Sequence, residues 1–362
     1  MSYITAIEVA VPDHCHTQDA MTSFYENSTD DLSLRRKIRA IASKAEIETR
    51  YSVLSDFSDT PDQYNFFAKN RSLEPEPTLT QRMACFRTEA LQLSLKAIRK
   101  IENLDAIKNS ITHIITVTCT GLFTPGLDVE IINELALKPS TQRSSVNFMG
   151  CNAAILALNS ANSICKSTPD SKVLIVCVEL CTIHFQKNYS NDYILSSALF
   201  GDGCAVVLVE SNDSDMKFYK GLQITSFNSL LIHKGYQEMA WQITEKGFIM
   251  NLTSYVSEII NGSMKEFLAG ISLAKASITN WAIHPGGKKI LDDFSEALNI
   301  DKTALYQSYD VLRKHGNMSS ATVLFVLKQV IESNANPEKN ETIFSAAFGP
   351  GLSVETMQLE YV

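Results

Sequence analysis

Cys151 stands where a folded chain can make a thiol reactive. It follows Gly150, between residues 145–148, which have the composition of a strand, and residues 151–165, which are small and apolar enough for a buried helix. A thiol at a helix start faces unpaired backbone N–H groups and the positive end of the helix dipole, which favour the thiolate. None of the other cysteines combines a strand end, a glycine and a helix start. We therefore interpret Cys151 as a nucleophile rather than a packed core thiol.

His284 and Asn317 are the residues that could assist this thiol. His284 ends a predicted strand, 278–283, and the Pro-Gly-Gly that follows leaves little side-chain bulk around the imidazole. Asn317 follows Gly316 at the start of a second small-residue helix, 318–330. Taken singly, such a histidine is more often structural and such an asparagine is more often a helix N-cap. Together with the thiol, all at strand or helix ends, they form a site suited to acyl transfer.

The elements that must position these residues alternate along the chain. In the first half we expect helices at 88–101, 127–137 and 151–165, and strands at 111–118, 145–148, 172–178 and 205–209. After a polar segment the order repeats, with strands at 221–227, 278–283, 341–348 and 352–359 and helices at 252–268, 292–298 and 318–330. Near-continuous apolar strands are typical of sheets covered on both faces. The pattern predicts an α/β protein of two similar halves, 1–216 and 217–362, with residues 17–79 lying over the core as helices and loops.

The composition excludes several classes of protein. The 362 residues carry a formal net charge of −8, which argues against broad affinity for nucleic acids or anionic membranes. No apolar run approaches the roughly 18 to 20 residues of a membrane span. Acidic residues precede the first basic one, Arg35, so neither a secretory signal nor a transit peptide fits. We expect a cytoplasmic protein with reduced cysteines and no metal site, and we interpret His14-Cys15-His16 as a surface turn.

Five stretches together resemble the type III polyketide synthases, the chalcone synthase-like branch of the thiolase superfamily. Their order and spacing agree with the family from about residue 40 to the end of the chain. The segment 241–252 is more similar to the bacterial members than to the plant ones. The five stretches are Gly150-Cys151, Ala198-Leu199-Phe200-Gly201-Asp202-Gly203, His284-Pro285-Gly286-Gly287, Gly316-Asn317-Met318-Ser319-Ser320-Ala321 and Phe348-Gly349-Pro350-Gly351.

The resemblance implies a thiolase-like αβαβα layered fold, a homodimer, and Cys151, His284 and Asn317 as the catalytic triad. In this mechanism the Cys151 thiolate, paired with the His284 imidazolium, attacks a starter acyl-CoA and holds the acyl group as a thioester. Malonyl-CoA then loses carbon dioxide, and His284 and Asn317 donate hydrogen bonds to the enolate oxygen. Because decarboxylation supplies the carbanion, we expect neither a carboxylate at the centre of the site nor any cofactor.

The resemblance assigns further residues with less weight. Phe200 matches a gatekeeping phenylalanine between substrate tunnel and cavity, and Met250 replaces the second one. Thr124 matches a residue that reaches into the partner subunit's cavity. Lys37 and Lys44 match lysines that bind the coenzyme A phosphates, although a solvated basic helix face is an equal alternative. The elongation cavity would be lined by Cys119, Cys181, His184, Ser196, Trp241 and Ser319, of which Cys119 and Trp241 differ from the plant residues.

We therefore predict an iterative polyketide synthase that extends an acyl-CoA starter with malonyl-CoA and cyclises the product to a pyrone, resorcinol or phloroglucinol. The bacterial likeness favours an aliphatic starter, and the sequence leaves its length, the number of extensions and the ring closure open. One alternative is a single-condensation β-ketoacyl synthase that finishes on an acyl carrier protein. A thiolase would need a reactive cysteine late in the chain, whereas the last one is Cys204. A catalytically silent dimerisation partner is the alternative outside the enzymes.

Overall fold

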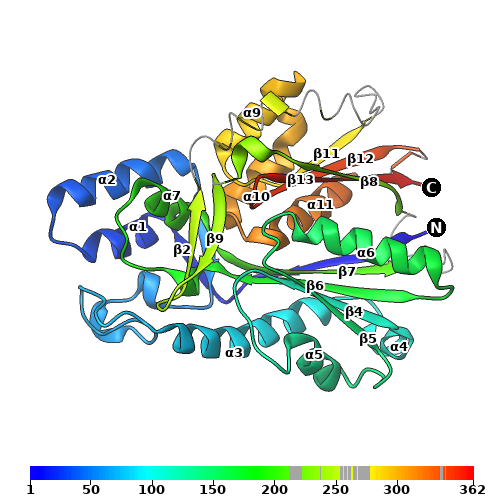
Figure 1. Cartoon of the computed structure of the whole chain (residues 1–362), viewed down its shortest axis with the longest axis horizontal. Helices are drawn as coiled ribbons and strands as arrows, with labels where there is room; N and C mark the ends of the chain where they lie inside the picture. The colour runs from blue at the N-terminus through cyan, green and yellow to red at the C-terminus, as the bar shows by residue number, and fades with distance from the viewer. Residues whose placement is uncertain are drawn as a thin grey trace.

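The computed structural model describes residues 1–211, 222–236, 238–252, 256, 259, 262–263, 267, 278–334, 337–338 and 340–362, without the side chains of residues 250–252. Within this part of the chain nine strands form one large sheet, and two pairs of short strands lie outside it. Figure 1 shows helices on the outer sides of the sheet and between its two halves. The layers match the predicted αβαβα arrangement.

The N-terminal half forms the strand order β1-β7-β6-β4-β5. The valine- and isoleucine-rich strands β4, β6 and β7 are buried along their whole length, because helices cover both of their faces. Helix α3 begins with a capping box between Thr78 and Gln81, and it packs on the outer face with α5. These elements are β1 (Tyr3–Ala10), α3 (Leu79–Ile98), α4 (Leu104–Ile107), β4 (His113–Thr118), α5 (Leu127–Leu135), β5 (Gln142–Asn147), α6 (Ala153–Ser167), β6 (Lys172–Leu180), α7 (Asn191–Leu199) and β7 (Asp202–Glu210).

The C-terminal half repeats the strand arrangement of the first. Its order is β8-β13-β12-β11, with two antiparallel pairs followed by a parallel pair. The strands β1-β7-β6-β4 pair in the same sequence of directions. The prediction of two similar halves is therefore confirmed by the topology. These elements are β8 (Leu222–Leu231), β9 (Met239–Ile243), β10 (Phe248–Leu252), β11 (Asn280–Ile283), α9 (Lys288–Leu298), α10 (Tyr306–His315), α11 (Thr322–Ser333), β12 (Thr342–Gly349) and β13 (Ser353–Tyr361).

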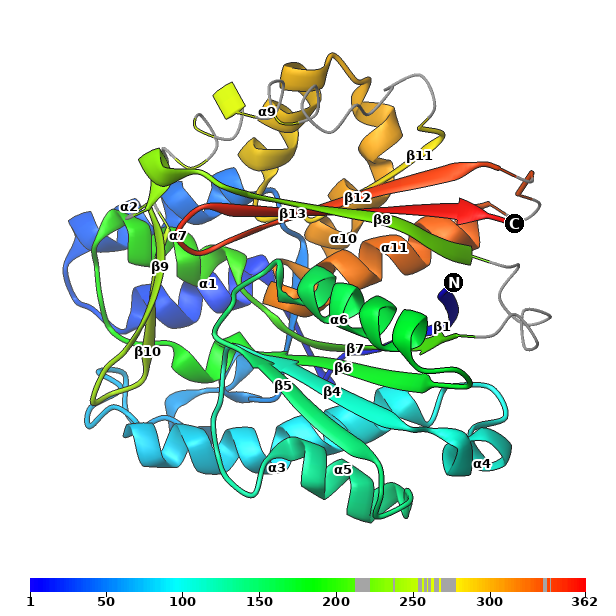
Figure 2. The ribbon, with the colours of Figure 1, turned by 45° about the vertical axis from the view of Figure 1, so that its right-hand side comes forward.

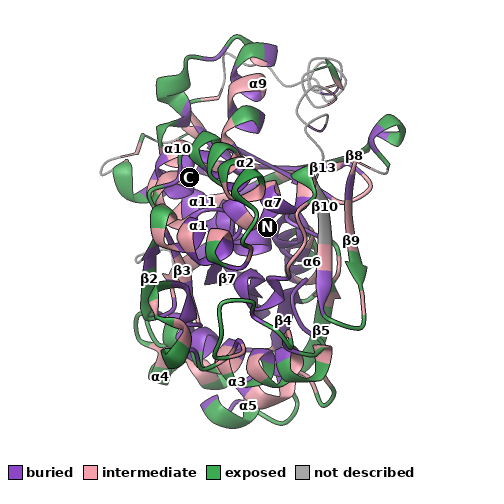
Figure 3. Ribbon diagram, turned by 90° about the vertical axis from the view of Figure 1, so that its left-hand side faces the viewer, coloured by how far each residue is buried: buried purple, intermediate pink, exposed green. Residues whose placement is uncertain are grey.

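Two helices lie between the halves of the sheet. The halves are joined where β1 pairs with β8 at only two positions, Tyr3↔Gln223 and Ile4↔Leu222. Helices α6 and α11 contact strands of both halves, and Figure 2 shows them between the upper and lower strands. In Figure 3 β7 and α11 are mostly buried, whereas α2 and α4 lie outside with exposed residues. The residue segments that precede α6 and α11 therefore meet near the same end of the sheet.

Residues 17–79 lie over one end of this core, as predicted, although they include the strand β3 and the last residue of the strand β2. The segment His14-Cys15-His16 is part of a strand rather than a turn, and its buried His16 bonds to Ser58 and to the carbonyl of Leu54. The sequence patterns also missed β1, the β9–β10 hairpin and α10. The predicted helix 252–268 and the boundary at residue 216 lie mostly or wholly outside the described residues, so both stay predictions. The remaining elements are β2 (His14–Thr17), α1 (Gln18–Asn27), α2 (Leu32–Ala42) and β3 (Thr49–Ser52).

No helix in the described part of the chain is both long and apolar enough to cross a membrane.

Candidate active site

Cys151 is held by a turn that only glycine can precede. Gly150 has φ +85°, and a Cβ placed on it would lie 1.9 Å from Cδ of Pro350. The turn is therefore pressed against the Gly-Pro-Gly loop between β12 and β13. Helix α6 starts two residues later at Ala153, with Asn152 as its N-cap residue. Cys151 is 3% exposed and points into the interior beside the helix start, close to the predicted position.

Asn317 and Ser319 lie against this thiol. The Sγ of Cys151 is 4.0 Å from Oδ1 of Asn317 and 3.7 Å from Oγ of Ser319. The backbone N–H of Ser319 donates to Oδ1 of Asn317 at 2.8 Å, which fixes the orientation of the amide group. Nδ2 of Asn317 therefore faces the Gly286 carbonyl oxygen, 3.3 Å away, and provides a hydrogen-bond donor at the site. The predicted thiol and carboxamide are brought into direct contact.

His284 follows β11 on the same side of the molecule. Its backbone N–H donates to the carbonyl of Ala346 in β12, and its side chain is 1% exposed. Both ring nitrogens are buried without a hydrogen-bond partner, and within the described residues no hydrogen bond joins the imidazole to Cys151. Such an unsatisfied buried group costs about 1–3 kcal/mol. Its free nitrogens are consistent with a group kept for a ligand.

Burial sets the charges of the resting site. It raises the pKa of the Cys151 thiol to about 12, and the contacts of the thiol with Ser319 and with Oδ1 of Asn317 only partly oppose this effect. Burial also lowers the pKa of His284 to about 3. Burial therefore acts against the thiolate that the helix start favours, because a charged thiolate loses its hydration there. Both shifts favour the neutral forms of the two groups.

Glu179 is a buried carboxylate that the sequence analysis missed. It lies at the end of β6, where Oε2 accepts from the backbone N–H of Cys119 at 2.9 Å and Oε1 accepts from Oγ of Ser320 at 2.6 Å. Burial raises the pKa of Glu179, and its charge in turn raises that of Cys151. Glu179 lines neither cavity and its hydrogen bonds go to Thr118, Cys119, Thr120 and Ser320, so the expectation of no carboxylate at the centre of the site stays a prediction. A glutamate ending an otherwise apolar strand was the available signal.

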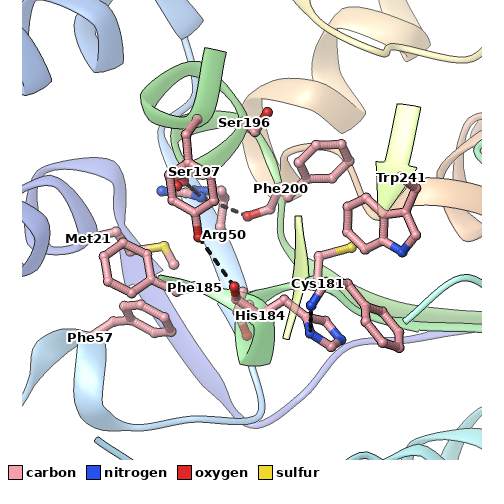
Figure 4. A pocket seen from close by; sticks show the side chains of 13 residues that line it. Met21, Arg50, Phe57, Cys181, His184, Phe185, Ser196, Ser197, Phe200 and Trp241 are labelled. Atoms are coloured by element: carbon pink, nitrogen blue, oxygen red, sulfur yellow. Dashed lines mark hydrogen bonds between the residues drawn. The ribbon is translucent and has the colours of Figure 1, made fainter. Parts of the chain in front are cut away.

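Two adjacent cavities lie near Cys151 and Asn317: Gly150, Phe200 and Ser319 are among their lining residues, whereas Cys151, His284 and Asn317 themselves line neither. Cys181, Phe200 and Trp241 line both of them, so these three side chains form the wall between the cavities. The near cavity lies next to Gly150 and is also lined by Cys119 and Ser319. The far cavity extends toward α1 and is largely aromatic, as Figure 4 shows. Its further lining includes Met21, Phe57, His184, Phe185, Tyr193, Ser196 and Phe248.

The wall is fastened by the β9–β10 hairpin. The indole Nε1–H of Trp241 donates to the carbonyl of Cys119 at 2.7 Å. On the opposite strand the backbone N–H of Phe248 donates to Nδ1 of His184, so His184 carries its hydrogen on Nε2 and donates to the Thr120 carbonyl at 2.7 Å. Burial lowers the pKa of His184 to about 3, which keeps the ring neutral. His184 thus has a structural part in addition to lining the far cavity.

Comparison with known proteins identifies the family. Residues 1–213 match the description "Chalcone and stilbene synthases, N-terminal domain", and residues 223–362 match the C-terminal domain of the same family. The chain belongs to the chalcone and stilbene synthase family. Members of this type III polyketide synthase family transfer acyl groups.

Relatives and solved structures agree with this placement. The chain is 32% identical, over 92% of its length and 84% of the relative's, to the α-pyrone synthesis polyketide synthase-like protein Pks18 of Mycobacterium tuberculosis. It is 29% identical to probable polyketide synthase 1 of Dictyostelium discoideum, of whose length it spans 11%. The C-terminal type III domain of the Dictyostelium type I/III hybrid Steely1 superposes with a TM-score of 0.90 at 26% identity, covering 100% of this chain and 99% of that one. Tetrahydroxynaphthalene synthase of Streptomyces coelicolor gives 0.86 at 25%, covering 99% of each chain.

The other residues assigned by resemblance to this family take varied positions. Thr124 is exposed before α5 and lines neither cavity of the single chain. Met250 pairs with Trp241 through its backbone, and its side chain lies outside the described part. Lys37 donates to the carbonyl of Tyr189 at 2.7 Å, whereas Lys44 is exposed in the turn after α2. The roles of these four residues stay predictions.

Proposed function

We propose that this chain is an iterative type III polyketide synthase that loads an aliphatic acyl-CoA starter on Cys151 and extends it with malonyl-CoA. The observation that carries the proposal is the contact of the Cys151 thiol with Asn317, next to a buried imidazole with two free nitrogens. A nucleophile and two potential donors to an oxyanion are the groups that decarboxylative condensation needs. We further propose that the enzyme is cytoplasmic and homodimeric and uses no cofactor beyond its coenzyme A substrates.

The neutral resting pair suits proton transfer during acylation. As Sγ of Cys151 attacks the thioester carbonyl carbon, the thiol proton passes to the imidazole of His284. The bond from carbon to the coenzyme A sulfur breaks, and coenzyme A leaves as a thiol that takes this proton. The thiolate and imidazolium then exist only while they attract one another in a site from which water is excluded. Burial of both groups thereby confines the charged state to the reaction itself.

Extension uses the donors that surround the thioester. Malonyl-CoA loses carbon dioxide, and the electron pair of the broken carbon–carbon bond forms the enolate of acetyl-CoA. His284 and Nδ2 of Asn317 donate to the enolate oxygen, and removing one such donor typically costs about 100- to 1,000-fold in rate. The enolate carbon attacks the acyl carbonyl, and the Cys151 sulfur leaves. The lengthened chain, now on coenzyme A, can load again.

The far cavity supports a flexible starter. Its lining is mostly apolar and aromatic, and it shares Cys181, Phe200 and Trp241 with the near cavity. A methylene chain can bend around such a wall, whereas a rigid ring system requires a straight slot. The growing polyketide would then occupy the near cavity with Cys119 and Ser319. The named relative that makes α-pyrones accords with lactone products.

The test is product analysis of the purified chain. Short-, medium- and long-chain acyl-CoA esters and an aromatic acyl-CoA are each incubated with malonyl-CoA, and products are identified by mass spectrometry. Triketide or tetraketide pyrones or resorcinols from the aliphatic series support the proposal. A product that stops after one condensation, or transfers only to an acyl carrier protein, supports the single-condensation alternative instead. Absence of both acylation and malonyl-CoA decarboxylation would indicate a silent fold member.

A further inference from the structure

Arg50 is a buried cation that no catalytic step above uses. It lies in β3, is 2% exposed, and ends beneath the C-terminal end of α7. Its Nη1 donates to the carbonyl of Ser197 at 2.6 Å and to that of Phe200 at 2.7 Å, and Figure 4 shows these contacts. Its Nε donates to Oε1 of Gln18 at 2.9 Å. Three N–H donors of the Arg50 guanidinium group are thus bonded to this helix end and to Gln18.

The carbonyl groups at this helix end all have partners. Gln18 donates through Nε2 to the carbonyl of Ala198 at 2.9 Å, and the backbone N–H of Phe200 closes the last turn on Ser196. The remaining carbonyl, that of Leu199, accepts from the backbone N–H of Asn317 at 2.9 Å. A positive group at a helix C-terminus is favoured because the last carbonyl groups are unpaired and partly negative. Arg50 supplies this charge from a buried position.

The segment that Arg50 holds is bonded directly to Asn317. Phe200 and Asn317 form a parallel bridge, in which Gly201 donates to the Asn317 carbonyl at 3.0 Å. Gly316 has φ +67°, and a Cβ placed on it would lie 2.6 Å from the Leu199 carbonyl and 2.9 Å from Cγ and Cδ of Arg50. The backbone before Asn317 therefore rests on the Arg50 stem itself.

Asp202 is the buried acid whose charge acts on Arg50, but the hydrogen bonds of Arg50 go to other groups. Asp202 stabilises the charge of Arg50, but its carboxylate accepts from the backbone N–H groups of Thr182 and Val53 and from Oγ1 of Thr182. The hydrogen bonds of the guanidinium group go to Gln18 and to two backbone carbonyls. The arrangement serves the position of the backbone more than it serves an ion pair.

We propose that Arg50 is a positioning residue that fixes Asn317 and the Phe200 wall for decarboxylation and condensation. The inference rests on the proposed function, since it concerns the donor that Asn317 would provide. Arg50 is also one of the residues that line the far cavity, but the hydrogen bonds of its guanidinium group go to Gln18 and to the carbonyls of Ser197 and Phe200. It acts through two backbone carbonyls and the strand-like bridge between Phe200 and Asn317. A displacement of about 1 Å in a reacting group can cost about 100-fold in rate, so a small shift of this bridge is sufficient.

The test compares Arg50→Lys and Arg50→Met with the wild-type chain. Malonyl-CoA decarboxylation is measured as kcat and KM, and acylation of Cys151 by an acyl-CoA is followed separately as the mass of the intact protein. We expect kcat for decarboxylation to fall about 10- to 100-fold in Arg50→Lys and further in Arg50→Met, with a smaller change in KM. Acylation should fall less than decarboxylation. Gln18→Leu, which removes one carbonyl contact of the same helix end, should have the smallest effect.

A remote variant separates positioning from general loss of stability. Lys172→Met removes the buried partner of Glu210 at the opposite end of β6, far from Asn317. It should lower thermal stability at least as much as Arg50→Lys while kcat of the folded protein stays unchanged. A folded Arg50→Lys protein with wild-type kcat would overturn the inference, as would an equal loss of kcat in Lys172→Met. If the wild-type chain itself neither decarboxylates malonyl-CoA nor becomes acylated, the proposed function fails before Arg50 is tested.

Discussion

The two ends of strand β6 bury polar groups in opposite ways. At its first residue the ammonium group of Lys172 lies 2.8 Å from Oε2 of Glu210, and Thr5 donates to the other carboxylate oxygen at 2.8 Å. Beyond its last residue, Cys151 makes only long contacts and His284 makes none through its ring. One end is a satisfied ion pair, and the other leaves reactive groups without strong partners.

The difference separates two roles of buried polar groups, which are to stabilise the fold and to react with a substrate. A buried ion pair is held by the attraction and hydrogen bonds that replace its lost water, and removing one partner typically costs about 3–5 kcal/mol. For an imidazole without hydrogen-bond partners, nothing in the resting structure compensates the free-energy cost of losing water. Under the proposed function the substrate compensates this cost, because its oxygen would accept a hydrogen bond from the imidazole. Changes at the two ends of β6 should therefore affect different measurements.

The largest effect is expected from Cys151→Ala. Without the thiol no acyl-enzyme forms, so condensation products should fall below detection by mass spectrometry. Cys151→Gln, whose amide imitates an acylated thiol, should retain malonyl-CoA decarboxylation. Cys165→Ala, a buried cysteine in the following helix, is the matched control and should remain active. Product formation by Cys151→Ala would remove the proposed nucleophile.

Asn317→Asp should reduce decarboxylation about 100- to 1,000-fold. The carboxylate keeps an oxygen acceptor for the Ser319 N–H but loses the Nδ2–H donor. The measurement is release of carbon dioxide from malonyl-CoA by the Cys151→Gln background and by the otherwise unchanged enzyme. Asn162→Asp, in α6 away from the cavities, controls for an added acidic group. A loss under tenfold would show that Asn317 is not a donor to the transition state.

Lys172→Met should lower the free energy of unfolding by about 3–5 kcal/mol, because it leaves the Glu210 carboxylate buried without its cation. Denaturant titration gives this value, and kcat measured below the transition should be unchanged. The control is Lys289→Met, which breaks an exposed pair with Asp293 worth about 0.5 kcal/mol or less. Loss of kcat in the folded Lys172→Met protein would contradict the separation of the two ends.

Alkylation of Cys151 should rise about tenfold for each pH unit between about pH 6 and about pH 9. The raised pKa of about 12 means that the thiol stays protonated over this range, and only the small thiolate fraction reacts. Iodoacetamide labelling followed by peptide mass spectrometry gives the rate, with the exposed Cys15 as an internal reference. A rate that is high and constant at acidic pH would instead reveal a thiolate–imidazolium pair in the resting enzyme.

The smallest effect is expected from Trp241→Phe. The ring keeps most of its packing in the wall between the cavities but loses the hydrogen bond to the Cys119 carbonyl. Such a bond contributes about 1 kcal/mol, so product ratios should shift only a few-fold toward longer chains. Trp281→Phe, which lines neither cavity, is the matched control. Equal product distributions from both variants would show that the wall does not limit chain growth.

Much of the fold could be predicted because its signals are local. The buried strands β4, β6 and β7 read as apolar runs, and the halves repeat the same order of elements. Strand β1 was missed, since a short mixed run gains its strand character from pairing with β7 and β8 far along the chain. The predicted turn at His14-Cys15-His16 was wrong for the same reason, because β3 supplies its partner.

The sequence placed the thiol and the carboxamide of the candidate site near each other, but it did not indicate how burial shifts the pKa of Cys151 and His284. Cys151 and Asn317 lie in contact, as glycine spacing and strand ends suggested. The residues next to Cys151 and Asn317 in the sequence do not predict the contacts of Glu179 or Arg50, which lie on other strands. The wall of Cys181, Phe200 and Trp241 likewise joins side chains from three separate segments.

The sequence by itself determined the family, the doubled α/β order and the identity of the thiol, imidazole and carboxamide, because these depend on residue types and short spacings. Only the tertiary structure decided that burial favours the neutral forms of Cys151 and His284, that Asn317 bonds to a segment held by Arg50, and that two cavities share one wall. The physical reason is that desolvation, hydrogen-bond partners and cavity walls sum over neighbours distant in the chain, whereas patterns of residues record only what lies nearby.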